Sequence, residues 1–229
     1  MRSDFIIPVN KPLHWTSFDV VNKLKYAIND FPFENRIKVG HAGTLDPLAT
    51  GLLVVCTGKC TKQISEIQDG KKTYRGIIRL GGTTPSFDLE TKIDQTFPVK
   101  HITEEMLIEA TKKFTGVISQ VPPIYSAVRI KGKKAYEHAR KGNRIEMKSR
   151  EVFIESFTIK KFTNADVHFE LICGKGTYVR SLAHELGKIL ESGAHLIELE
   201  RTRVGPYALE NAIHPEQFRT FLEKHLNTT

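Results

Sequence analysis

The sequence predicts an α+β fold in which a largely antiparallel sheet is flanked by helices. Segments rich in β-branched and aromatic residues alternate with segments of helical periodicity, but without the regular rhythm of βαβ units. Several of the predicted strands follow one another directly along the chain. These observations favour one α+β domain for the 229 residues.

The first elements follow from local patterns. Residues 5–9 have the composition of a short strand, and residues 51–55 suit either a buried strand or the start of a helix. Between them, a helix is predicted to begin at the N-cap Ser17. Its apolar face consists of Phe18, Val21, Leu24 and Ile28. Residues 73–80 are predicted to form the next strand.

The later elements show clearer periodicity. One helix has the apolar face Met106, Leu107, Ala110 and Phe114, and Gly116 is its predicted stop. Residues 152–159 and 167–173 are β-rich, and the second run alternates between apolar and more polar side chains. A helix over residues 179–189, a strand over 196–203 and a short helix opened by Pro215 complete the order.

Composition indicates a globular protein of the cytoplasm. No stretch has the roughly 20 apolar residues of a membrane helix, and Pro8 interrupts the short apolar run near the N-terminus. Cys56, Cys60 and Cys173 lack the spacing of a zinc site, so we interpret them as small buried side chains in a reducing compartment. The formal net charge of +8 favours a polyanionic partner.

The most informative segment is the glycine-rich loop from Gly40 to Gly51, with the sequence GHAGTLDPLATG. Its glycines, proline and small polar residues are typical of a shaped loop rather than a regular element. Asp46 stands immediately before Pro47. Taken alone, this pair favours a cap of a helix or turn that begins at Pro47, because Asp-Pro is a common helix opening; the alternative is a functional carboxylate.

Further segments share a known pattern with this loop. Residues 10–17 contain NKP and TS, residues 72–75 read KTYR, and residues 120–127 read QVPPIYSA. Residues 174–182 read GKGTYVRSL, and residues 193–203 contain GAHL and RTR. In this order the segments resemble the TruB family of tRNA pseudouridine synthases, over nearly the whole chain from about residue 5 to residue 207.

The resemblance implies the pseudouridine-synthase fold and the isomerisation of uridine to pseudouridine at position 55 in the T-loop of tRNA, without cofactor or metal. It implies one catalytic domain over residues 1–229, with a basic RNA-gripping insertion at about 124–150 and a short tail over 208–229 in place of a PUA domain. We therefore expect recognition of the T-arm alone, no obligate protein partner and no membrane association, with a monomer as the default.

The resemblance also assigns catalytic roles. Asp46 is the nucleophilic aspartate, and Arg180 is the arginine that pairs with it and favours its charged form. The alternatives for Arg180 are a phosphate contact or a surface position. Tyr74 lies against the flipped uracil and could handle the proton that leaves C5, whereas a strand tyrosine is ordinarily a core residue.

Other residues are carried over as substrate contacts. Tyr178 and Leu199 are expected to line the pocket, and His41 to help the target nucleotide leave the loop stack. Asp88 is expected to arrange the refolded T-loop, although Pro85 replaces an acidic residue of the family pattern. Lys11 belongs to the opening motif and is expected to contact substrate.

Residues 129–150 form a basic segment that is either a solvated loop or, by the resemblance, an RNA contact. Arg129 and Lys133 are its predicted substrate-binding residues. The basic side chains of this segment are Arg129, Lys131, Lys133, Lys134, Arg140, Lys141, Arg144, Lys148 and Arg150.

Two other functions compete with this interpretation. One is an RNA chaperone of the tRNA elbow, which would have no use for Asp46, Tyr74 and Arg180 together. The other is the RNA-guided relative of the family, which depends on partner proteins. Leu13-His14-Trp15 is bulkier than the family's glycine-containing version, and the sequence alone assigns His14 and Trp15 no role.

Overall fold

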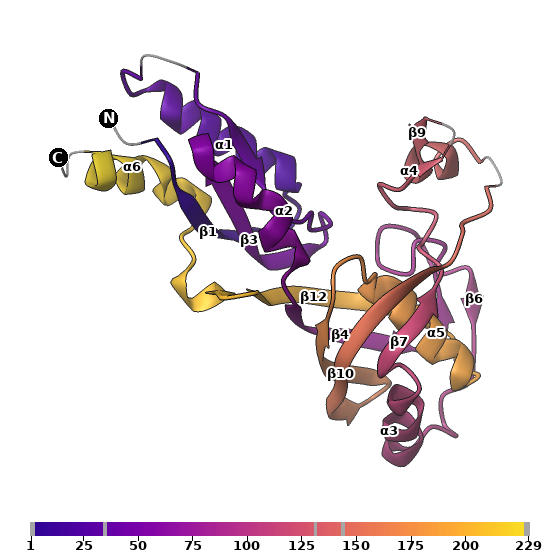
Figure 1. Cartoon of the computed structure of the whole chain (residues 1–229). Helices are drawn as coiled ribbons and strands as arrows, with labels where there is room; N and C mark the ends of the chain where they lie inside the picture. Colours follow the sequence, from indigo (N-terminus) through magenta and orange to yellow (C-terminus); the bar gives the residue numbers. More distant parts are fainter. Residues whose placement is uncertain (1–2, 34–35, 131, 143–144, 227–229) are drawn as a thin grey trace. The chain divides into compact units, whose positions relative to one another are not determined.

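A computed structural model describes residues 3–33, 36–130, 132–142 and 145–226. The chain divides into two compact units. The first unit comprises Met1–Tyr74 and Leu199–Thr229, and the second unit comprises Arg75–Glu198. The chain crosses between them within two strands, β4 (Lys72–Leu80) and β12 (Ala194–Val204) (Figure 1). The two units are described separately below, and the prediction of a single domain stays a prediction.

The strands of the first unit centre on β3 (Ala49–Thr57), which is almost entirely buried. The strand β1 (Ile6–Lys11) pairs with it antiparallel, from Ile6 opposite Cys56 to Lys11 opposite Gly51. The short β2 (Val39–His41) is also antiparallel to β3, whereas the C-terminal part of β12 runs parallel to it. The prediction of a strand at residues 51–55 is therefore confirmed, and the helical alternative is excluded.

Helices α1 (Ser17–Asn29) and α6 (Phe218–Leu226) share a hydrophobic core with β1 and β3. The core includes Leu24, Leu53, Phe218 and Leu222, all buried. The remaining elements of this unit are short. They are α2 (Ile64–Asp69), β13 (Tyr207–Ala208) and the 3-10 turns Gly58–Gln63, Leu209–Asn211 and Pro215–Gln217.

The start of α1 corrects two predictions. The N-cap is Thr16, not Ser17, because Thr16 and Asp19 form a reciprocal capping box. The buried face is centred on Val20, Leu24 and Ile28, and Phe18 is turned by roughly 120° from that direction. Phe18 is consequently 62% exposed rather than part of the core.

In the second unit, β10 (Arg150–Thr163) is paired antiparallel with both β11 (Asp166–Cys173) and β7 (Gly116–Gln120). The predicted alternation is confirmed in β11, where Val167, Phe169, Leu171 and Cys173 are all buried. The unit's longer helices are α3 (Glu104–Lys112) and α5 (Val179–Ile189). Its short elements are β5 (Gly82–Thr83), β6 (Gln95–Thr96), β8 (Arg129–Ile130), β9 (Lys133–Lys134) and α4 (Ala135–Ala139).

Two helix predictions in this unit need adjustment. The helix α3 ends at Lys112, four residues before the predicted stop, and Gly116 instead begins β7 with a positive φ of 96°. Met106 is 39% exposed, so the apolar face of α3 rests mainly on its other predicted members. In the described part of the chain, no helix is long and apolar enough to cross a membrane.

Gly51 and Gly116 provide a matched test of steric crowding, because both have a φ of 96°. A Cβ at Gly51 would lie 2.4 Å from the carbonyl oxygen of Arg201, whereas a Cβ at Gly116 meets no atom within 4 Å. Gly116→Ala should therefore cost about 1 kcal/mol of backbone strain. Gly51→Ala should cost about 3 kcal/mol or more, because it adds overlap with packed backbone.

Urea denaturation of the two variants measures this difference directly. If both variants lose the same unfolding free energy, the contact between Gly51 on β3 and Arg201 on β12 is less crowded than the structure shows.

Candidate active site

The glycine-rich loop of the first unit connects β2 to β3 and presents Asp46 at a turn. The amide of Ala49 donates to the carbonyl oxygen of Asp46 at 3.0 Å, and residues 47–48 form the turn itself. No helix begins at Pro47 in the described chain, but a turn does, so only the helical form of the structural interpretation of Asp46 is excluded. The carboxylate is held on a turn and is partly exposed.

Side chains and backbone groups from other segments hold this loop on both sides of Asp46. The Ser17 hydroxyl accepts from the amide of Leu45 at 2.8 Å and donates to its carbonyl at 3.2 Å. The amide of His14 donates to the carbonyl of Pro47 at 2.8 Å. These bonds fix the residues immediately before and after Asp46.

Within the unusual Leu13-His14-Trp15 sequence, His14 has a backbone conformation that favours glycine. His14 has a φ of 67°, a left-handed conformation that strains any residue with a side chain. This conformation belongs to the tight turn in which the amide of His14 meets the carbonyl of Pro47. Trp15 packs against the hydrophobic core of the unit, so the larger side chain at this position has a packing role.

Two buried cations lie near Asp46. Lys11 is fully buried, and its ammonium donates to the carbonyls of Pro12 at 2.9 Å and Trp15 at 2.6 Å. Burial lowers the pKa of Lys11 to about 8, although the negative charge of Asp46 opposes that decrease. The positive charge of Arg201 lowers the pKa of Lys11 further.

His41 completes this part of the site at the end of β2. Burial, followed by the positive charge of Arg201, lowers the pKa of His41 below its ordinary value. The ring is therefore neutral at pH 7. Its Nδ1 atom is buried and has no hydrogen-bond partner in the described part of the chain.

Tyr74 and Leu199 belong to the first unit and lie on β4 and β12, the two strands that continue into the second unit. Leu199 lies opposite Ala49 in the parallel β3–β12 pairing, which places it beside the Asp46 turn. Tyr74 is buried near the start of β4, and the hydroxyl of Thr202 donates to the carbonyl of its neighbour Thr73 at 3.3 Å. The structure thus brings five predicted residues into the first unit: Lys11, His41, Asp46, Tyr74 and Leu199.

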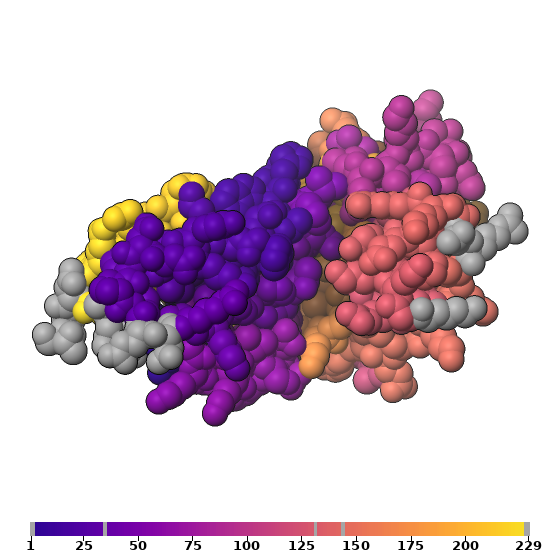
Figure 2. All heavy atoms as spheres, turned by 90° about the horizontal axis from the view of Figure 1, so that it is seen from above, coloured from indigo at the N-terminus to yellow at the C-terminus, as the bar shows by residue number. Residues whose placement is uncertain are grey.

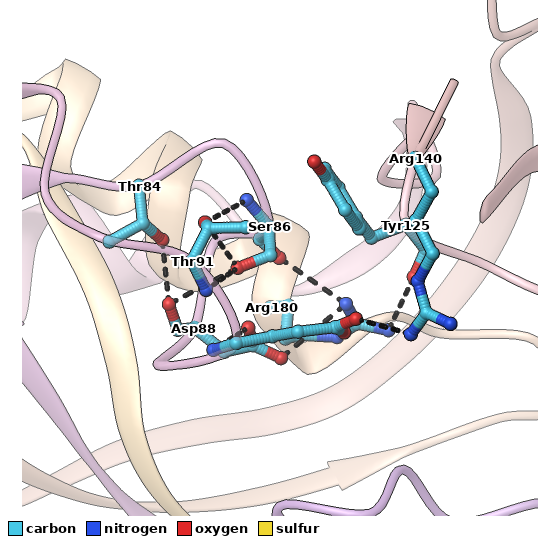
Figure 3. Close-up of polar contacts among 8 residues, drawn as sticks. Thr84, Ser86, Asp88, Thr91, Tyr125, Arg140 and Arg180 are labelled. Atoms are coloured by element: carbon cyan, nitrogen blue, oxygen red, sulfur yellow. Dashed lines mark hydrogen bonds and ion pairs between the residues drawn. The ribbon is translucent and has the colours of Figure 1, made fainter. Parts of the chain in front are cut away.

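Arg180 organises a separate polar cluster in the second unit (Figure 3). It lies in the first turn of α5 and is 3% exposed. Its guanidinium donates to the carbonyls of Ser86 at 3.3 Å and Tyr125 at 3.1 Å, and it pairs with the carboxylate of Asp88 at 3.5 Å. Arg180 therefore joins three segments that are distant in sequence.

The polar network around Asp88 forms despite Pro85. The hydroxyls of Thr84 and Ser86 donate to the carbonyl of Asp88, at 2.7 and 3.2 Å. The carboxylate of Asp88 accepts from the amide of Glu90 at 2.9 Å. Hydroxyl groups thus order this turn where the family pattern has another acid.

Tyr178, the N-cap residue of α5, is held by Gln120. The amide of Tyr178 donates to Oε1 of Gln120 at 2.8 Å, and its carbonyl accepts from Nε2 at 3.1 Å. The guanidinium of Arg150 lies over the Tyr178 ring, 4.7 Å from its centre. The ring therefore has one face covered by a cation from the basic segment.

The basic segment forms part of the second unit's surface, shown in salmon in the space-filling view (Figure 2). Arg129 and Lys133 are exposed at the β8–β9 hairpin. Next to it, Tyr136 lies 5.5 Å from the ammonium of Lys134 and 5.3 Å from the guanidinium of Arg140. Lys131 and Arg144, which the sequence also assigns to this segment, lie outside the described residues.

The predicted residues therefore divide between the units. The second unit holds Asp88, Arg129, Lys133, Tyr178 and Arg180. The predicted pairing of Arg180 with Asp46 joins residues of different units and stays a prediction. In the described chain, no group of three or more His, Cys, Asp or Glu side chains is arranged to hold a metal ion.

Sequence reasoning missed several residues that build the site. Ser17 was expected only as a helix cap, and Gln120 and Arg201 only as members of motifs. Arg201 is 1% exposed and donates to the loop carbonyls of Gly43 and Leu52. Its neighbours Glu200, Thr202 and Arg203 are polar and none of them is buried, so no local pattern indicated that Arg201 is buried.

Comparisons with known proteins agree with this architecture. Residues 32–179 match the N-terminal domain of the TruB family pseudouridylate synthases, and residues 180–228 match the tRNA pseudouridylate synthase B C-terminal domain. The tRNA pseudouridine synthase B of Flavobacterium johnsoniae is 51% identical over 219 residues, covering 95% of this chain and 96% of the relative. That of Parabacteroides distasonis is 49% identical over 221 residues, covering 96% and 94%.

Solved structures show the same fold. A chain in the crystal structure of a Cbf5-Nop10-Gar1 complex superposes with a TM-score of 0.71 and 28% identity. The match covers 96% of this chain but 56% of that one. The fold and sequence together define a pseudouridylate synthase. The chain belongs to the TruB family, as the motifs predicted.

The buried pair of Asp88 and Arg180 should contribute more to stability than an exposed pair of the same residues. Asp88→Asn removes the negative charge facing a buried guanidinium and should cost about 3 kcal/mol of unfolding free energy. The control is Asp166→Asn, which breaks the pair with the half-exposed Arg79 and should cost less than about 1 kcal/mol. Similar losses in chemical denaturation would contradict the role given to Asp88.

Lys11 should make stability depend on alkaline pH. Its pKa falls from 10.5 to about 8 on folding, so between these values the unfolded chain binds a proton that the folded chain lacks. The free energy of unfolding should therefore rise with pH across this window, by at most about 3 kcal/mol from this group. Lys11→Met removes this contribution.

The measurement is urea denaturation of wild type and Lys11→Met between pH 7.5 and 10.5. The stability of wild type relative to the variant should increase with pH. Lys62→Met, at an exposed position, reports the effect of losing one surface charge. A wild-type advantage that stays constant across this range would show that Lys11 keeps an ordinary pKa.

Proposed function

We propose that this chain isomerises uridine to pseudouridine at position 55 in the T-loop of tRNA, with Asp46 as the catalytic carboxylate. The observation that carries the proposal is the Asp46 turn, which Ser17 and His14 hold on both sides and which lies within electrostatic range of the buried ammonium of Lys11. The tRNA pseudouridine synthases B that match almost the whole chain support the same substrate.

The reaction needs a negative charge at a defined place. The bond from N1 of uracil to C1′ of ribose breaks, the base turns, and a bond forms between C5 and C1′. The hydrogen on C5 then leaves as a proton, so atoms and electrons balance without a redox partner. A carboxylate fixed on a rigid turn meets the ribose or the base without the entropic cost of ordering a mobile side chain.

The other residues have supporting roles in the proposal. Tyr74 offers a ring for stacking and a hydroxyl for the C5 proton. Arg180 is oriented by Asp88 and by two backbone carbonyls, so its guanidinium is already ordered when substrate arrives. Its pairing with Asp46 is part of the proposal.

Recognition would use the basic segment and the aromatic groups within it. Exposed Arg129 and Lys133 are suited to phosphate contacts, which supply affinity without reading sequence. Base extrusion costs a few kcal/mol, and such contacts can offset it. Tyr178 and Leu199 would then line the pocket, with His41 at its entrance as a neutral imidazole.

The proposal includes action as a monomer in the cytoplasm, without an obligate protein partner. The competing function is an RNA chaperone whose catalysis is secondary or lost. A chaperone requires the basic surface but no fixed carboxylate, so the hydrogen bonds that hold the Asp46 turn favour the enzyme. An RNA-guided enzyme would need partner proteins for activity.

One assay separates these possibilities. Purified protein alone is incubated with a tRNA transcript carrying tritium at C5 of uridine, and tritium release is measured. Wild type should release one equivalent from the target uridine. Asp46→Asn should be slower by about 10³-fold or more, because the substitution removes the reacting carboxylate and keeps its shape.

The control is Asp166→Asn, an acid-to-amide change in the second unit that should retain the wild-type rate. Absence of release from wild type, or equal release by Asp46→Asn, would refute the catalytic assignment. Release that requires added proteins would favour the RNA-guided alternative.

A further inference from the structure

The guanidinium of Arg201 spans the beginning and the end of the Asp46 loop. Its Nη2 donates to the carbonyl of Gly43 at 2.9 Å, and its Nε donates to the carbonyl of Leu52 at 2.8 Å. Nη1 lies 3.5 Å from the carbonyl of Thr44. One side chain from β12 therefore holds the residues on either side of the segment that carries Asp46.

Close backbone contact between β3 and β12 lets the Arg201 side chain reach these carbonyls. Gly51 lies opposite Arg201 in the parallel pairing, and no side chain fits there, since a Cβ would lie 2.4 Å from the Arg201 carbonyl. Gly43 has a φ of 102°, a conformation that favours glycine, and its carbonyl accepts from Arg201. The two glycines and the arginine thus form one geometric unit.

We propose that Arg201 is a positioning residue for Asp46: its rigid three-carbonyl clamp sets the place of the carboxylate relative to the substrate. Lysine cannot reproduce this clamp, because a single ammonium lacks the planar fork of a guanidinium. The proposal rests on the function proposed above. It assigns Arg201 no direct contact with the reacting atoms.

Electrostatics supports the same assignment. The positive charge of Arg201 lowers the pKa of both Lys11 and His41, whereas Asp46 raises that of Lys11. The charge of Arg201 therefore acts on Lys11, the same buried cation that interacts with Asp46. The competing interpretation is that Arg201 only stabilises the fold, and that the loop would hold Asp46 equally well without the clamp.

The test compares Arg201→Lys and Arg201→Met with wild type. Single-turnover rates of tritium release are measured with saturating enzyme, and tRNA Kd is measured separately by filter binding. Arg201→Met should react about 100-fold more slowly, because a shift of about 1 Å in a reacting group costs about this much. Arg201→Lys keeps the charge and should lose about 10-fold, and both variants should bind tRNA within about 3-fold of wild type.

Hydrogen exchange provides a readout that does not need activity. The amides of residues 43–46, 48 and 49 should exchange at least about 10-fold faster in both variants, while peptides from β10 and β11 in the second unit keep wild-type protection. The matched control is Arg203→Lys, two residues along the same strand with an exposed side chain, which should change neither rate nor exchange.

The outcomes are separable. Rates of the folded variants within about 3-fold of wild type, or faster exchange throughout the chain, would overturn the positioning role. If Arg201→Met does not fold, Arg201→Lys decides by the same criteria. If wild type itself releases no tritium, the proposed function is overturned instead. The hydrogen exchange of residues 43–49 would still test whether Arg201 holds the loop.

Discussion

The close approach of β12 to β3 at Gly51 is the constraint on which the geometry of the Asp46 loop depends. Absence of a side chain at Gly51 lets the backbone of Arg201 lie against β3 in parallel register. That register directs a buried guanidinium at carbonyls on both sides of the loop. Gly51 and Arg201 are far apart in sequence, and together they determine the local shape of the Asp46 loop, which has no regular hydrogen bonding of its own.

Buried cations have two roles in such a loop. An irregular backbone leaves carbonyls without the partners that a helix or sheet would supply, and each buried carbonyl needs a donor. Lys11 donates to the carbonyls of Pro12 and Trp15, and Arg201 donates to those of Gly43 and Leu52. The charge of Lys11 also interacts with that of Asp46, so one buried side chain acts on both the backbone and the carboxylate of this region.

Sequence reasoning was most successful where one local pattern dominates. The alternation in β11 and the position of α5 followed from periodicity, and the motif identified the family. It failed where a choice depends on distant partners. Thr16 and Ser17 are chemically similar, but only Ser17 meets Leu45, 28 residues away, so the cap moved by one position.

Arg201 was overlooked because its partners lie about 150 residues earlier in the chain. Pro85 seemed to threaten the Asp88 network, which the hydroxyls of Thr84 and Ser86 form instead.

The two arginines solve different electrostatic problems. Arg180 has a carboxylate partner, Asp88, within its own unit, together with two backbone carbonyls. Its orientation is thus set before any pairing with Asp46 is considered. Within the first unit, the charge of Asp46 interacts with that of the buried Lys11. The pairing of Arg180 with Asp46 is the part of the proposed function that would connect these two groups. Its value to the reaction would lie in orientation, which is the form of preorganisation that catalysis rewards most.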